Sequence, residues 1–125
     1  MRQLFHLAID PGSRAVRIAL AEKSLDVELK AEPVWERRQE FLALNPAGEI
    51  PVLVEEDGTP ICGVATILDY LDEAYPDRQL IHGDALARAE IRRLTDWFLV
   101  KFAYEVTDCL VGEKLMKRFL VGQNP

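Results

Sequence analysis

Hydrophobic and polar residues follow two different periods along the start of the chain. Residues 3–9 form a mostly apolar run that ends at Asp10 and Pro11, which predicts a buried strand and then a helix with Asp10 at its N-cap. Residues 13–23 carry apolar side chains at helical spacing, as an amphipathic helix does. Residues 26–32 alternate apolar and charged positions, which predicts a half-buried strand whose apolar side is Val27, Leu29 and Ala31.

The middle of the chain predicts a second helix, a β-hairpin and a third helix. Residues 34–44 are expected to form one irregular helix that ends at the turn-forming residues 45–48. Two short apolar runs, 52–54 and 59–62, flank a glycine-containing loop and predict the hairpin. Residues 64–75 form the third helix, and a proline follows it. This order of elements requires an α/β fold, in which a mixed sheet has helices on both faces.

Residues 77–84 show no periodicity and are expected to link two domains, residues 1–76 and residues 85–125. The second domain begins with a long helix whose apolar stripe is Ile91, Leu94, Phe98, Phe102 and Val106. A stripe of this length needs partner helices or another copy of the chain to cover it. We favour the first explanation, in which the chain is a fragment of a longer protein with a truncated helical domain.

Composition excludes several classes of protein. Apolar residues make up 49% of the chain and charged residues 29%, which is typical of a globular domain, and the net charge of −6 argues against a nucleic-acid partner. The two cysteines and two histidines form neither a CxxC pair nor a metal-ligand pattern; they are Cys62, Cys109, His6 and His82. No apolar run is long enough for a membrane span or a signal peptide. We therefore expect a cytoplasmic protein without a metal site or membrane insertion.

Three segments, residues 13–20, 41–53 and 67–71, resemble the N-terminal domain of the glutathione S-transferase superfamily in both sequence and spacing. The following long helix is similar to the first helix of that superfamily's all-α C-terminal domain. The resemblance implies a thioredoxin-like mixed four-stranded sheet with flanking helices, a homodimer, and glutathione as a cofactor.

The resemblance also implies where glutathione would bind. It implies a cis bond between Ile50 and Pro51, which leaves the backbone of Ile50 free to pair with the ligand. Gly63 and Val64 occupy the positions where the family has an acidic residue and a serine that hold the γ-glutamyl carboxylate. The N-terminus of the third helix still offers backbone N–H groups to an anion there. The resemblance therefore implies the remnants of a glutathione site at Ile50, Pro51, Gly63 and Val64, where glutathione would bind only weakly.

The position that activates the glutathione thiol departs furthest from the family. Asp10 stands where a serine or cysteine would donate a hydrogen bond to the thiolate, and a carboxylate has no proton to donate. Asp10 is expected to act as a helix N-cap instead. No catalytic residue is established, and Ser13 is the only nearby hydroxyl that could replace the missing donor.

The Cys62–Gly63 pair, Trp35 and Trp97 resemble a narrower branch of glutathione-transferase-like proteins from alphaproteobacteria. That branch includes a cell-division protein that binds the tubulin-like polymer FtsZ. The leading hypothesis is therefore a non-catalytic scaffold that binds an FtsZ filament, with candidate protein-binding residues Trp35, Glu113, Lys117 and Arg118. The alternatives are a glutathione-dependent transferase or reductase of small electrophiles, and a binder of small molecules or anions.

Overall fold

A four-stranded mixed sheet forms the centre of the first of two units in the chain, Met1–His82; the computed structural model describes residues 1–111. The strands are β1 (Gln3–His6), β2 (Glu28–Ala31), β3 (Val52–Val54) and β4 (Pro60–Cys62), in the spatial order β2-β1-β3-β4. β1 is parallel to β2, whereas β3 is antiparallel to both β1 and β4. The α/β fold class and the hairpin that we predicted are confirmed.

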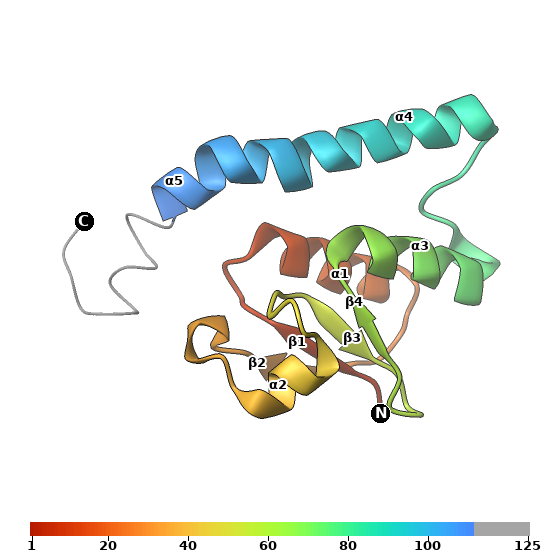
Figure 1. Cartoon of the computed structure of the whole chain (residues 1–125). Coiled ribbons are helices and arrows are strands. Elements are labelled where there is room, and N and C mark those ends of the chain that lie inside the picture. The colour runs from red at the N-terminus through yellow and green to blue at the C-terminus, as the bar shows by residue number, and fades with distance from the viewer. Residues whose placement is uncertain (112–125) are drawn as a thin grey trace. The chain divides into compact units, whose positions relative to one another are not determined.

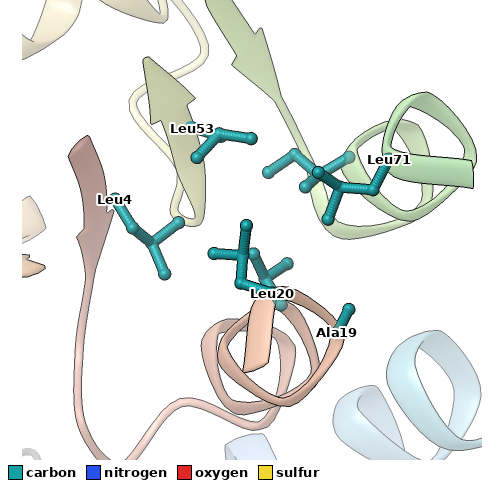
Figure 2. Packing of buried hydrophobic residues seen from close by; sticks show 7 residues of the cluster. Leu4, Ala19, Leu20, Leu53 and Leu71 are labelled. Atoms are coloured by element: carbon teal, nitrogen blue, oxygen red, sulfur yellow. The ribbon is translucent and has the colours of Figure 1, made fainter. Parts of the chain in front are cut away.

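Two helices, α1 (Pro11–Glu22) and α3 (Val64–Ala74), pack on one face of this sheet (Figure 1). Figure 2 shows Leu4 and Leu53 of the sheet directed towards Leu20 of α1 and Leu71 of α3, and all four side chains are buried. Burying a leucine side chain stabilises a fold by about 1.5–3 kcal/mol. This layer is therefore the main core of the unit, and it fixes the positions of both helix N-termini.

The opposite face of the sheet is covered by α2 (Gln39–Leu44), which buries Phe41 against Val52 and Val54. Residues 34–44 do not form the single helix that we predicted. A short 3₁₀ turn, Val34–Glu36, precedes α2, and Arg37 between them has the left-handed φ of 48°. The physical reason lies in the next residue, because Arg38 turns towards the sheet and forms a bidentate ion pair with the buried Glu32.

β2 also differs from the half-buried strand that the alternating pattern predicted. Leu29 is 48% exposed and Ala31 is exposed as well, whereas the buried side chain at this end of the strand is Glu32. Among the described residues, β2 is the outermost strand of the sheet and pairs with β1 alone. Its apolar side consequently projects past the edge of α1, which covers the central strands and not the outer one.

The residues after α3 remain attached to the first unit as far as His82. Pro76–Arg78 form a 3₁₀ turn, and the amides of Leu80 and Ile81 donate hydrogen bonds to the carboxylate of Asp72 in α3. Ile81 is buried. Part of the linker that we predicted over residues 77–84 is therefore packed on α3.

The second unit begins at Gly83 with α4 (Ala85–Asp96), whose N-cap Asp84 accepts a hydrogen bond from Ala87 N. The chain continues in helical turns with π-type hydrogen bonds, Trp97–Lys101 and Ala103–Thr107, and then α5 (Asp108–Val111). Several large apolar side chains of this unit are exposed, namely Leu86, Leu94, Trp97, Phe98, Val100, Phe102, Tyr104 and Leu110. No helix within residues 1–111 is long and apolar enough to cross a membrane.

Candidate functional site

Three segments of the first unit converge at one end of the sheet: the loop before α1, the start of β3 and the N-terminus of α3. The Ile50–Pro51 bond is cis, as the resemblance implied. Gly63 N donates a hydrogen bond to Pro51 O over 3.1 Å. A Cβ atom placed on Gly12 would lie 3.6 Å from both Pro51 Cδ and Val64 Cβ. The structure therefore brings Pro51, Gly63 and Val64 together beside the start of α1.

Asp10 is the N-cap of α1, as predicted. Its Oδ2 accepts hydrogen bonds from Ser13 N at 2.7 Å and from Ser13 Oγ at 2.8 Å. The Ser13 hydroxyl also accepts from Leu7 N at 3.4 Å, and Ser13 is completely buried. A hydroxyl that already donates its proton to a carboxylate cannot donate it to a thiolate as well. In this arrangement Ser13 stabilises the first turn of α1.

Arg17 of α1 holds the loop that carries Asp10. Its guanidinium donates to the carbonyls of Leu7 and Ala8, and its Nη1 lies 2.9 Å from His6 Nδ1. Burial and the neighbouring Arg17 charge lower the pKa of His6, so its imidazole is neutral at physiological pH and accepts from Arg17. This pair was not predicted from the sequence. The available signal was Arg17 in the second turn of the helix that follows His6, a polar residue in a mostly apolar strand.

The N-terminus of α3 carries no side-chain cap. Gly63 has the left-handed φ of 94°, which favours glycine, and because glycine has no side chain this position offers a carboxylate only its backbone. Val64 is half-buried, so what this end can offer an anion is backbone N–H groups and the helix dipole.

Cys62 precedes this helix and is directed into the protein. Its thiol donates a hydrogen bond to Leu44 O at 3.5 Å, and burial raises the pKa of the Cys62 thiol. The thiolate is the nucleophilic form of cysteine, so Cys62 is poorly suited to thiol chemistry. Within residues 1–111, no three His, Cys, Asp or Glu side chains gather in a way that could hold a metal ion.

The candidate protein-binding residues lie in different parts of the chain. Trp35 is in the 3₁₀ turn before α2 and is 41% exposed. Glu113, Lys117 and Arg118 lie outside the described residues. The prediction that these four residues bind a protein partner therefore stays a prediction.

A second polar cluster, which the sequence analysis also missed, lies at the other end of the sheet. Glu55 follows β3 and accepts hydrogen bonds from the hydroxyls of Tyr70 and Tyr75, at 2.8 and 2.5 Å. Arg2 completes the cluster through its ion pair with Glu55 at 3.0 Å. Burial and the bond to Glu55 raise the pKa of Tyr70 to about 12. Every group in this cluster has a partner within it, which indicates a structural role.

The mixed sheet, the cis-proline and the helix N-termini beside it define a thioredoxin-like domain. Residues 4–79 match the family described as "Glutathione S-transferase, N-terminal domain". The chain belongs to the glutathione S-transferase family.

Individual relatives place the chain more closely. It is 44% identical over 123 residues to "FtsZ-localized protein A" of Caulobacter vibrioides, a match that covers 95% of this chain and 54% of the relative. Among solved structures, a glutathione S-transferase from Rhodospirillum rubrum F11 has 52% identity and a TM-score of 0.95 over 100% of this chain and 56% of its own. The solved structure "FzlA from C. crescentus" has 42% identity and a TM-score of 0.92, and the match covers 99% of this chain and 56% of FzlA. The chain thus spans about half the length of these relatives.

Proposed function

We propose that this protein is a glutathione S-transferase-like scaffold that binds an FtsZ filament and does not use glutathione for catalysis. The observation that carries the proposal is the Asp10–Ser13 pair. At the position where the family supplies a donor to the thiolate, this chain has an acceptor, and the nearest hydroxyl is buried against it. An added thiolate would meet the Asp10 carboxylate and no donor.

The carboxylate end of a glutathione molecule would also lose contacts. At Gly63 and Val64 the chain has neither the acid nor the hydroxyl that the family uses, and α3 has no side-chain cap. Each lost charge-assisted hydrogen bond costs about 1.5–3 kcal/mol, which is tenfold or more in affinity. A glutathione complex that relied on backbone N–H groups alone would therefore be weak.

The similarity to "FtsZ-localized protein A" over 95% of the chain supports FtsZ as the partner. The half-exposed Trp35 and the exposed Trp97 and Phe98 supply aromatic anchors of the kind that interfaces use. In this proposal Glu113, Lys117 and Arg118, which lie outside the described residues, also contact the partner. The protein would act in the cytoplasm as a homodimer.

A glutathione-dependent transferase or reductase of small electrophiles is the second candidate. The convergence of Gly12, cis-Pro51 and Val64 favours it, because this framework would hold the cysteinyl unit of glutathione. The high similarity to a glutathione S-transferase from Rhodospirillum rubrum F11 points the same way.

Two binding measurements separate these candidates. In calorimetry with glutathione up to millimolar concentration, the scaffold predicts no dissociation constant below about 1 mM, equivalent to roughly −4 kcal/mol. In co-sedimentation with polymerised FtsZ, it predicts that the protein pellets with the filaments. Arg118→Glu should reduce the pelleted fraction, whereas Arg14→Glu, at an exposed position of α1, should leave it unchanged. Submillimolar glutathione binding without co-sedimentation would reverse our ranking.

A further inference from the structure

Within residues 1–111, β2 pairs with β1 alone, so its outer edge presents backbone hydrogen-bonding groups without a partner strand. Glu28 N donates to Arg2 O and Glu32 N donates to His6 O, so the amides at even-numbered positions of this strand face β1. Because backbone groups alternate in direction along a strand, the N–H and C=O groups of Leu29 and Ala31 point away from the sheet. We call this row of groups the free edge of β2. Such an edge is a template for pairing with another strand.

A partly apolar hollow lies beside the free edge, lined by residues of α1, of the turn after it and of β2. Its apolar lining consists of Leu20, Ala21, Leu25, Val27 and Leu29. A strand added to the edge would place alternate side chains on this same face of the sheet, directly beside the hollow. The free edge therefore offers both hydrogen bonds and a place for an apolar side chain.

The charges on the other face of β2 indicate which molecule pairs with the free edge. Glu28 and Lys30 are both about half exposed, and their charged groups lie 2.8 Å apart. If two copies of β2 pair antiparallel with Leu29 opposite Leu29, then Glu28 of each copy lies opposite Lys30 of the other. This register also makes Leu29 a hydrogen-bonded pair with its own equivalent, which matches the outward direction of its N–H and C=O. The strand is thus complementary to itself in hydrogen bonding, in apolar contact and in charge.

We propose that the free edge of β2 binds a second copy of this chain through an antiparallel, twofold-symmetric strand pair centred on Leu29. Two leucine side chains fill the joined hollows on one face, and two Glu28–Lys30 pairs cross the interface on the other. The sheet then runs continuously through both copies. This contact is separate from any dimer formed through the second unit.

Disulfide trapping tests the register directly. In a hydrogen-bonded antiparallel pair the two Cα atoms lie about 5.5 Å apart, which suits a disulfide, so Leu29→Cys should link to itself. In the same register two Glu28 Cα atoms lie about 8 Å apart, so Glu28→Cys should not self-link. The experiment uses the full chain with Cys62→Ala and Cys109→Ser, under mild oxidation. We expect Leu29→Cys to cross-link at least tenfold faster than Glu28→Cys.

Two further comparisons distinguish this register from chance collision. A mixture of a Glu28→Cys chain and a tagged Lys30→Cys chain should form the mixed disulfide faster than either chain links to itself. In the Leu29→Cys background, Lys30→Glu should slow cross-linking at least fivefold, and the double exchange Glu28→Lys with Lys30→Glu should restore the rate. Equal rates at positions 28 and 29, or no recovery in the double exchange, would overturn the proposal.

Discussion

Replacing Asp72 with asparagine tests how strongly one buried carboxylate fastens the end of the first unit to its helices. Asp72 Oδ1 lies 2.9 Å from Lys23 Nζ, and these side chains are only 4% and 2% exposed. The same carboxylate accepts hydrogen bonds from Leu80 N at 2.9 Å and from Ile81 N at 2.6 Å. Removing one member of a buried ion pair costs about 3–5 kcal/mol, because the other charge is left without compensation. We expect Asp72→Asn to lower the free energy of unfolding by that amount.

The pH dependence gives this prediction a direction. Burial acts to raise the pKa of Asp72, but the hydrogen bonds from Leu80, Lys23 and Ile81 outweigh it, and the pKa is lowered. A carboxyl with a lowered pKa stabilises the folded state above its unfolded pKa of about 3.9, and that stability is lost as the pH falls through the folded pKa. The difference between wild type and Asp72→Asn should therefore be constant near neutral pH and shrink below about pH 4.

Urea unfolding followed by circular dichroism measures both effects. The double variant Asp72→Asn with Lys23→Met should recover part of the loss, because it removes the buried charge that Asp72→Asn leaves without a counter-ion, while Tyr75 O and Arg78 O lose their donor. Glu90→Gln, which breaks an exposed ion pair with Arg93 on α4, should cause no measurable change. A loss below about 1 kcal/mol at neutral pH, or a difference that persists unchanged at low pH, would refute the reasoning.

Three other substitutions test the site and the core. Ser13→Ala should cost about 1 kcal/mol in thermal unfolding through its lost bond to Asp10, with unchanged calorimetric glutathione binding; a drop in glutathione affinity would contradict the structural role. Tyr70→Phe should cost about 1 kcal/mol at neutral pH. Because the pKa of Tyr70 is raised to about 12, the stability that Tyr70 contributes should be lost as the pH rises from about 10 to 12. An absorbance titration of Tyr70→Phe should lack the ionisation step near pH 12 that the wild type shows. Phe41→Ala should cost about 3–5 kcal/mol in urea unfolding, and a loss below 1 kcal/mol would contradict its packing role.

The elements of the first unit could be predicted because their signals are local. Pro11 after Asp10 marks the start of α1, and a glycine-containing loop between two apolar runs marks the hairpin. The interruption at Arg37 could not be predicted, because it depends on the ion pair between Arg38 and Glu32 across the edge of the sheet.

The exposure of β2 was beyond prediction for a related reason. Alternation in a strand shows which side chains share a face but not whether another element covers that face. Leu29 is apolar and lies on the side of α1, yet it is 48% exposed because β2 is the outermost strand. The order of strands in a sheet depends on contacts between distant segments, and these have no signature in a short window of sequence.

At the candidate site, the structure confirms the N-cap that the sequence predicted at Asp10. An N-cap needs an acceptor for the free N–H groups of the first helical turn, whereas a thiolate needs a donor. One oxygen of Asp10 accepts from both the amide and the hydroxyl of Ser13, so the side chain that satisfies α1 also occupies the nearest hydroxyl. Asp10 does not alter the arrangement of cis-Pro51 and Gly63, because these two residues are joined by a backbone hydrogen bond. In the proposed scaffold, one residue at the N-cap would therefore keep the fold intact while removing the donor that glutathione chemistry requires.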